Sequence, residues 1–193
     1  MKPTANLLKI RLFAVAMGLL ISASLTQGAL IDNGGFTTDT ETGLDWLDMY
    51  HTVADSYNST LAAISPGGSL HGWRFATSAE FYGLIDAAVG SSYTPVGSNG
   101  YDPAIYSEMV TLVSLLGYTF DTFYEIGTYG FVDSSELTDG YRILFGYTYD
   151  GDARVTPAES GNYMDKNSKG GSTGSFLVRA TSVPDTVSTA ALL

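Results

Sequence analysis

Cysteine is missing from this chain altogether. No disulfide can therefore form, whatever the redox state of the compartment in which the protein works. A thiol nucleophile and a zinc site built from cysteine thiolates are excluded for the same reason. The stability of the folded chain must come from the packing of its apolar side chains, which make up 45% of the residues.

Basic residues are also scarce, with nine lysines and arginines against twenty acidic residues in the 193-residue chain. Three of the nine lie within residues 1–28, which contain no acidic residue, so the rest of the chain carries a formal charge of −14. Such a surface repels phosphate backbones, which excludes nucleic acid as a partner class. Anionic polysaccharide would be repelled as well, unless a cation bridged the two surfaces.

Histidine and recognisable nucleophile motifs are sparse too. His51 and His71 are the two histidines, and the chain contains no Gly-x-Ser-x-Gly elbow. A serine nucleophile needs a histidine base that an acid orients, and no motif here brings such a set together. We therefore expect a protein that is not an enzyme. The alternative is a secreted polysaccharide hydrolase that uses two of the twenty acidic residues as a carboxylate pair.

Long apolar runs are absent. The longest, Leu12–Ile21, has ten residues, half of the ~20 that a membrane-spanning helix needs. Basic residues precede this run and small and polar residues follow it, which is typical of an export signal. We expect residues 1–28 to be a signal peptide cleaved after Gly28, with an uncleaved membrane anchor as the alternative. The protein is then secreted or held at the outer surface or in the extracellular matrix, and it associates with the membrane only transiently.

The residues from 29 to 181 fit one α+β domain, in which helices come early and strands late. Residues 29–31 and a hairpin over 36–48, with its turn at 39–43, are predicted strands. Three helices are predicted next. Their apolar stripes are Val53, Tyr57, Leu61 and Ile64; Phe81, Leu84, Ile85, Ala88 and Val89, after a cap at Thr77 or Ser78; and Ile105, Met109, Leu112 and Leu116, after Pro103.

Strand patterns dominate the second half of this domain. Residues 119–132 are rich in aromatic side chains, residues 141–149 alternate, and residues 175–180 form a closing strand. The polar, glycine-rich residues 150–173 are predicted to be a long loop. The first and last segments are both strands. We therefore expect a mostly antiparallel sheet with two to three helices and paired terminal strands.

Four short motifs occur in the order typical of one family. They are Thr42-Gly43-Leu44-Asp45-Trp46, Gly72-Trp73-Arg74-Phe75-Ala76-Thr77, Ala79-Glu80-Phe81 and Phe176-Leu177-Val178-Arg179. On these motifs residues 36–180 resemble the Lcl C-terminal-like domains of exported bacterial proteins, although Ala76 replaces a usual proline and a frequent cysteine is missing. The resemblance implies a C-type-lectin-like fold with paired terminal strands. It also implies structural roles for Gly43, Leu44, Trp46, Gly72, Trp73, Arg74, Thr77, Glu80 and Arg179.

A second resemblance concerns the last residues, 182–193, which contain Val183-Pro184-Asp185 and a short apolar stretch. They resemble the start of a PEP-CTERM sorting signal of the Val-Pro-Asp variant, either truncated or degenerate, because the apolar span and basic tail do not follow. This resemblance implies an exosortase and its export machinery as partners, in systems linked to exopolysaccharide. An ordinary C-terminal tail is the alternative.

The candidate ligand-binding residues are Tyr147, Tyr149, Asp150 and Asp152. The two tyrosines end an alternating strand, where they form either a carbohydrate-binding surface or part of the sheet packing. Asp150 and Asp152 are calcium candidates, although Asp150-Gly151-Asp152 lacks the ordered spacing of an EF-hand loop. No other metal and no organic cofactor is expected.

The two tryptophans could stack on sugars, but core packing is the preferred interpretation of Trp46 and Trp73. Arg74 and Glu80 are expected to form a structural ion pair. Taken together, these features predict an exported, non-catalytic protein that binds extracellular polysaccharide weakly. Some relatives in the resembled family bind sulfated glycans, a ligand class that a formal charge of −14 does not suit.

Overall fold

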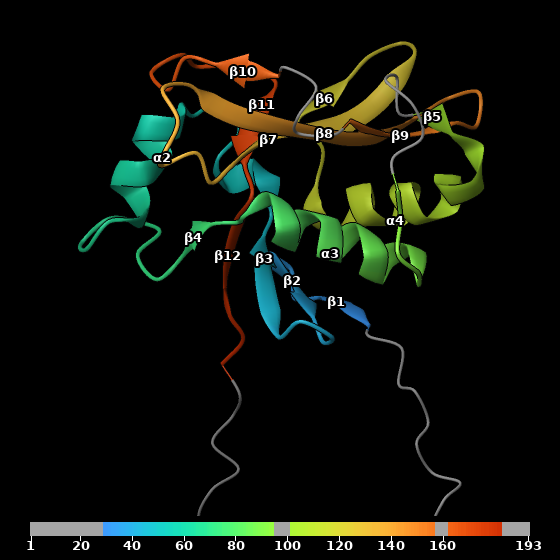
Figure 1. The fold of residues 1–193 in the computed structure, drawn as a ribbon, viewed down its shortest axis with the longest axis horizontal. Coiled ribbons are helices and arrows are strands. Elements are labelled where there is room, and N and C mark those ends of the chain that lie inside the picture. The colour runs from blue at the N-terminus through green and yellow to red at the C-terminus, as the bar shows by residue number, and fades with distance from the viewer. Residues whose placement is uncertain (1–28, 95–100, 157–161, 183–193) are drawn as a thin grey trace, which may run out of the picture.

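The larger of two β-sheets forms one side of the molecule, and the helices α3 and α4 lie beneath it, with the smaller sheet below (Figure 1). The computed structural model describes residues 29–94, 101–156 and 162–182. The predicted signal peptide and all but the first residue of the predicted sorting signal, 182–193, lie outside this range. The described part is α+β and mostly antiparallel sheet, which confirms the predicted fold class.

The smaller sheet brings together the two ends of the described chain. Its strands, in spatial order, are β1 (Leu30–Asp32), β2 (Phe36–Asp39), β3 (Leu44–Leu47), β12 (Leu177–Ala180) and β4 (Arg74–Phe75). The β2–β3 hairpin has the predicted turn, in which the buried Asp39 carboxylate accepts hydrogen bonds from the Glu41 backbone N–H and the Thr42 hydroxyl. Gly43 closes this turn with a φ of 67°, which favours glycine.

The predicted pairing of the terminal strands needs a correction. β12 pairs with β3 and β4, whereas β1 lies at the other edge of the sheet. The register explains the choice, because it sets Val178 opposite Trp46 and Arg179 opposite Asp45. β12 thereby buries Val178 and pairs Arg179 with the buried Asp45, whereas the residues of β1 are half-buried or exposed.

The helices α3 (Ser78–Val89) and α4 (Tyr106–Leu116) form as predicted. Thr77 caps α3 in a capping box with Glu80, and Gly90 ends it with a left-handed φ of 74°. A 3₁₀ turn, η2 (Pro103–Ile105), leads into α4, which ends at Gly117. The predicted stripes face the core. The residues of these two stripes that are fully or almost fully buried are Phe81, Leu84, Ile85, Ile105, Met109, Leu112 and Leu116.

The predicted stripe of the first helix is only partly right: Tyr57 is buried and Ile64 is half-buried against the core, but Val53 and Leu61 are not part of the buried face. α2 (Tyr57–Ile64) begins only after Ser56, which caps it in a capping box with Ser59. Its buried residues are Tyr57 and Thr60, whereas Val53 and Leu61 are exposed. Val53 lies in a turn after the 3₁₀ segment η1 (Met49–His51). The four-residue spacing from Val53 to Tyr57 therefore joins a turn residue to the first residue of the helix and does not define a helical face.

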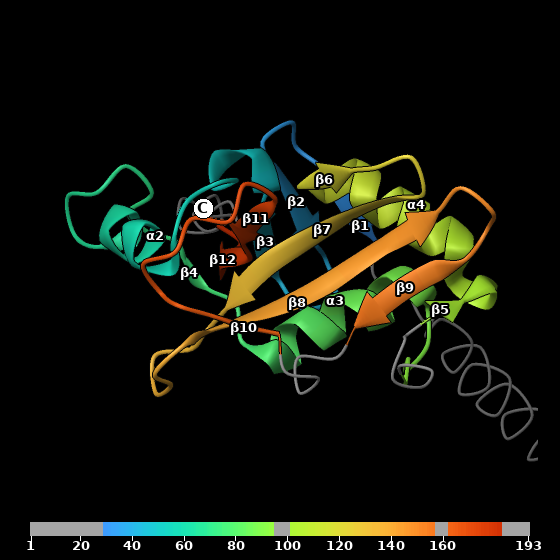
Figure 2. The ribbon, with the colours of Figure 1, turned by 90° about the horizontal axis from the view of Figure 1, so that it is seen from above.

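The larger sheet has the order β11-β7-β8-β9-β5, with β6 pairing β7 and β10 pairing β8. β7, β8 and β9 run side by side through its middle (Figure 2). The strand bounds are β5 (Tyr101–Asp102), β6 (Phe120–Asp121), β7 (Glu125–Val132), β8 (Gly140–Thr148), β9 (Ala153–Thr156), β10 (Tyr163–Met164) and β11 (Thr173–Ser175). All pairs are antiparallel except β11 with β7.

Two further predictions are wrong in this region. Residues 150–173 are not one long loop, because β9 and β10 form within them and pair with β8. Ala153 and Val155 are fully buried, and this short alternation was masked by the polar residues around it. Residues 175–180 do not form one strand either: the chain leaves the larger sheet after Ser175 and enters the smaller one at Leu177.

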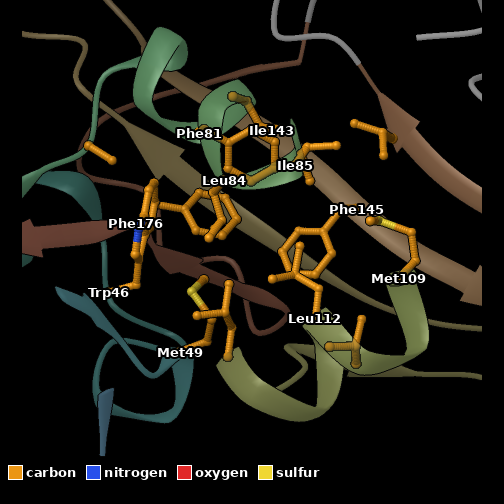
Figure 3. Close-up of a cluster of buried hydrophobic side chains, with 14 of the residues drawn as sticks. Trp46, Met49, Phe81, Leu84, Ile85, Met109, Leu112, Ile143, Phe145 and Phe176 are labelled. Atoms are coloured by element: carbon orange, nitrogen blue, oxygen red, sulfur yellow. The ribbon is translucent and has the colours of Figure 1, made fainter. Parts of the chain in front are cut away.

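Phe176 lies where the chain passes between the two sheets. Its ring packs against Phe81, with ring centroids 4.8 Å apart, and against Phe145 at 6.0 Å (Figure 3). A Cβ added at Gly130 would lie 2.5 Å from the Phe176 ring, so glycine is needed there for the ring to fit. Trp46, only 1% exposed, belongs to the same cluster (Figure 3). One core therefore holds both sheets and two helices together.

Candidate functional site

The motif residues of the resembled family gather around the smaller sheet. Arg179 lies between two rings, with its guanidinium carbon 4.4 Å from the Trp73 ring centroid and 4.8 Å from that of Phe36. Its Nε donates to the buried Asp45 carboxylate at 3.0 Å. We call Phe36, Trp73, Arg179 and Asp45 the aromatic clamp. It fastens β12 to the N-terminal hairpin.

Trp46 and Trp73 have different positions. Trp46 is a core residue, as predicted, whereas Trp73 is half-buried at the surface and meets Phe36 edge-on, with centroids 6.3 Å apart. Arg179 covers one face of the Trp73 ring. The clamp therefore acts as a fastening, in which one ring face of the tryptophan is already occupied.

Arg74 and Glu80 form the predicted ion pair. Arg74 Nη1 and Nη2 donate to the two Glu80 carboxylate oxygens at 2.8 and 2.5 Å. This two-point hydrogen bond lowers the pKa of Glu80 to about 2, and bonds from the Thr77 backbone N–H and hydroxyl add to the effect while burial opposes it. Because both carboxylate oxygens accept bonds within the fold, this pair stabilises the start of α3.

The most exposed aromatic side chains lie at one end of the larger sheet. Phe123 is 98% exposed, and Tyr118, Tyr124 and Tyr149 are 57%, 45% and 56% exposed. We call these four residues the aromatic rim. Tyr118 follows α4, Phe123 and Tyr124 form the turn between β6 and β7, and Tyr149 begins the turn from β8 to β9. Both turns lie at the same end of the sheet (Figures 1 and 2).

Hydrogen bonds hold the two turns of the rim together. The Thr122 hydroxyl accepts from the Glu125 backbone N–H at 3.0 Å, and the Thr122 N–H donates to the Glu125 carbonyl at 3.0 Å, which closes the turn under Phe123. The Tyr149 N–H donates to the Tyr124 carbonyl at 3.0 Å. Phe123 is thus exposed on a closed turn and not on a loose loop.

The predicted residues Tyr147 and Tyr149 belong to this region in different ways. Tyr147 is half-buried and packs edge-on against Tyr106, with centroids 5.7 Å apart, so sheet packing describes it better than an open surface. The Tyr149 hydroxyl donates to Asp121 Oδ1 at 2.9 Å, and this bond raises the pKa of Tyr149. Burial raises the pKa of Tyr147. Both hydroxyls stay protonated at neutral pH.

The predicted acids Asp150 and Asp152 lie in the β8–β9 turn, beside Tyr124. The negative charge of Asp150 is the main reason that the pKa of Tyr124 is raised, and Asp152 adds to it. Two carboxylates supply at most about four of the six to eight oxygens that calcium prefers. Within the described ranges, no group of three or more histidine or acidic side chains is placed to hold a metal ion. The calcium interpretation gains no support here.

The buried Glu125 forms an ion pair with the half-buried Arg154 next to the rim. Glu125 Oε2 lies 3.3 Å from Arg154 Nη1, and the Arg154 guanidinium carbon is 5.3 Å from the Tyr101 ring centroid. Glu125 Oε1 is buried without a hydrogen-bond partner. Burial raises the pKa of Glu125 although Arg154 opposes the shift. Arg154, the arginine next to the rim, is thus already engaged by Glu125.

Sequence reasoning missed Asp121 and three of the four rim residues. A signal was present, because the seven residues Tyr118–Tyr124 contain four aromatic side chains. All of them except Tyr118 fall within residues 119–132, which are predicted to be a strand because aromatic residues favour strands. Only Phe120 of this run and Asp121 enter a strand, the two-residue β6, and the turn that follows leaves Phe123 and Tyr124 exposed.

A groove of about 370 Å³ lies between β1, α3 and α4, away from the rim. Its lining mixes apolar and polar side chains, and Glu108 is its one carboxylate. A glycoside hydrolase needs a pair of carboxylates across the scissile bond. The groove therefore gives no support to the alternative hydrolase prediction. None of the helices in the described part of the chain is long and apolar enough to cross a membrane.

Comparisons with protein-family models, with curated proteins and with solved structures found no match to this chain.

Proposed function

We propose that this protein is an exported, non-catalytic domain that binds glycan through its aromatic rim and works at the outer surface or in the extracellular matrix. One observation carries the proposal: four exposed aromatic side chains lie at one end of the larger sheet, three of them on two hydrogen-bonded turns and Tyr118 just before β6. They are four of the ten large apolar side chains that the described residues expose, and one of them is almost fully exposed. An exposed apolar patch of this kind marks an interaction surface.

The chemistry of the rim suits a sugar. Aromatic rings offer large, flat apolar faces with little conformational freedom to lose, and tyrosine adds a hydroxyl that can exchange hydrogen bonds. The raised pKa values of Tyr124 and Tyr149 keep both hydroxyls protonated at neutral pH. The Tyr124 hydroxyl can donate and accept, whereas the Tyr149 hydroxyl already donates to Asp121 and can only accept from a ligand. A shallow rim without a deep pocket is consistent with weak binding to a long polymer.

The arrangement of the chain ends supports a surface location. β1 and β12, the first and last described strands, both belong to the smaller sheet, and the rim lies at an end of the larger one (Figure 1). A molecule attached through its C-terminal tail would keep the rim free for a ligand. The predicted signal peptide and the Val-Pro-Asp tail are the sequence features behind export and sorting.

The Lcl-like, C-type-lectin-like assignment also belongs to this proposal. Its support is the order of the four motifs and the return of β12 to the N-terminal hairpin, with Arg179 of the last motif bonded to Asp45 of the first. In this proposal the motifs define the fold and the rim supplies the function.

The experiment is a glycan-binding measurement on the purified protein, a Phe123→Ala variant and a Tyr50→Ala control. Tyr50 is 59% exposed on η1, outside the rim, so it matches the rim tyrosines in exposure. We expect Phe123→Ala to weaken binding roughly tenfold, equivalent to about 1.4 kcal/mol, and Tyr50→Ala to leave it unchanged. Equal weakening by both variants, or no binding by the unmodified protein, would contradict the proposal.

A further inference from the structure

Carboxylates surround the aromatic rim. Asp121 accepts the Tyr149 hydroxyl, and Asp121 and Asp150 are both exposed. Asp152 lies two residues further along the same turn, and its backbone N–H is bonded to the Thr148 hydroxyl at 3.0 Å. The rim thus places negative charge on both of its turns, beside open ring faces.

Five of the six lysine and arginine side chains of the described chain are engaged elsewhere, and the sixth, Lys169, is exposed in the loop before β11, which pairs with β7 at Tyr129–Phe131. Arg154 is paired with Glu125 and lies over Tyr101. Arg142 lies over Tyr129 and bonds Thr173, six residues or roughly 20 Å along β8 from the rim turn. The remaining engaged cations are Arg74 with Glu80, Arg179 with Asp45, and Lys166 with the Ser134 and Leu137 carbonyls. The charge that a ligand meets at the rim is therefore negative.

We propose that the rim binds a glycan that carries free amino groups, such as a polymer of glucosamine that lacks its N-acetyl groups. This inference rests on the proposed function and names its ligand class. Each ammonium group meets carboxylates that can accept charge-assisted hydrogen bonds and ring faces that attract cations. The apolar faces of the sugar rings stack on the aromatic side chains.

Charge also decides against the other glycan classes. Sulfated and uronate-bearing glycans would meet like charge at the rim and across a chain with a formal charge of −14 beyond residue 28. A neutral glycan would gain the stacking but not the electrostatic attraction. The same negative field draws a polycation toward the protein before contact, so association is expected to depend on salt.

The test is isothermal titration of the purified protein with a glucosamine hexamer and with the same hexamer fully N-acetylated. We expect the amine form to bind roughly three- to tenfold more tightly, from one or two exposed charge pairs. This preference should shrink as ionic strength rises from about 0.01 M to about 0.15 M, over which the screening length falls from about 30 Å to about 8 Å. Equal affinity for both hexamers would overturn the ligand class and leave the proposed glycan binding standing.

Variants locate the site. Asp150→Asn with Asp152→Asn should remove most of the amine preference and leave binding of the acetylated hexamer unchanged. The matched control is Glu136→Gln with Asp139→Asn, the same charge change in the exposed turn at the other end of the β7–β8 hairpin. Equal losses in both double variants would mean non-specific attraction and would overturn the site.

Two other outcomes would overturn the proposed glycan binding as well as the ligand class. If neither hexamer binds, the inference and the proposed function both fall. If neither hexamer binds but the molecular mass of the protein rises with concentration and Phe123→Ala abolishes this rise, the rim is a contact between copies of the chain, which also overturns both.

Discussion

The aromatic clamp and the aromatic rim both combine aromatic and acidic side chains, but the clamp stabilises the fold whereas the rim forms an open surface. In the clamp an arginine lies between two rings and pairs with a buried carboxylate, so the group closes on itself. In the rim the rings stay open, and the acids beside them bond a tyrosine hydroxyl or remain exposed. The same composition therefore fastens a strand in one place and leaves a surface free in the other.

The difference lies in one cation of the chain itself, which determines whether the aromatic rings and the carboxylates beside them are occupied or remain open to a ligand. Arg179 satisfies both the ring faces and the carboxylate of the clamp, so little is left for a ligand. The rim lacks such a cation because Arg154, the nearest one, is paired with Glu125. Mutations should thus reduce stability at the clamp and its core but reduce binding at the rim.

The largest effect on stability is expected in the main core, at Phe176. Phe176→Ala removes a ring that is 1% exposed and contacts both Phe81 and Phe145. The loss of apolar burial and the cavity that remains should lower the free energy of unfolding by about 3–5 kcal/mol. Chemical denaturation followed by fluorescence measures this, and a loss below about 1 kcal/mol would contradict the position of Phe176 between the sheets.

The next effect is expected when the clamp loses its cation. Arg179→Ala leaves the Asp45 carboxylate, whose side chain is 3% exposed, without its charged partner, and uncovers the Phe36 and Trp73 rings. Because Arg179 itself is partly exposed, we expect a loss of about 2 kcal/mol, below the range for a fully buried pair. Arg179→Lys should recover only part of it, since lysine lacks the planar guanidinium. A neutral Arg179→Ala variant would show that the clamp does not fasten β12.

A smaller, pH-dependent effect is expected at the start of α3. The pKa of Glu80 is lowered from 4.5 to about 2, so its carboxylate stabilises the fold above the ordinary pKa and loses this contribution as pH falls toward 2. The stability difference between the native protein and Glu80→Gln should therefore be constant near neutrality and shrink below about pH 4.5. Thermal unfolding across that range measures it. If the stability difference between the two proteins stays constant down to about pH 2.5, the Arg74–Glu80 pair does not contribute as described.

The smallest stability effect is expected at the rim. Phe123→Ala removes a side chain that is 98% exposed, so the free energy of unfolding should change by less than about 0.5 kcal/mol. The same variant is expected to bind glycan roughly tenfold more weakly. A large loss of stability would mean that Phe123 packs against part of the molecule, and the contrast between clamp and rim would then fail.

Much of the α+β fold could be predicted from local signals. Thr77 and Glu80 marked the start of α3, Gly117 marked the end of α4, and the turn at residues 39–43 marked the first hairpin. Each of these signals acts within a few residues, which is why one sequence suffices to find it. The packing of Trp46 into the core also followed from its size and type.

The parts that could not be predicted depend on distant contacts. β9 becomes a strand because β8 offers it a partner and a core for Ala153 and Val155. The Phe176 ring fits between the two sheets because Gly130, far away in sequence, leaves room for it. Phe123 is exposed because β6 has only two residues before the turn. None of these causes is visible in the local pattern.

Chemical-shift mapping by NMR tests the central claim most directly, because it reports every amide that a ligand perturbs. The glucosamine hexamer is titrated into the labelled protein, and the shifted amides are compared between the rim and the clamp. We predict that the shifts concentrate in residues 118–125 and 149–152 and leave Phe36, Trp73 and Arg179 unchanged. Shifts centred on Trp73 and Arg179, with a silent rim, would contradict the division of the molecule into a fastening and a binding surface.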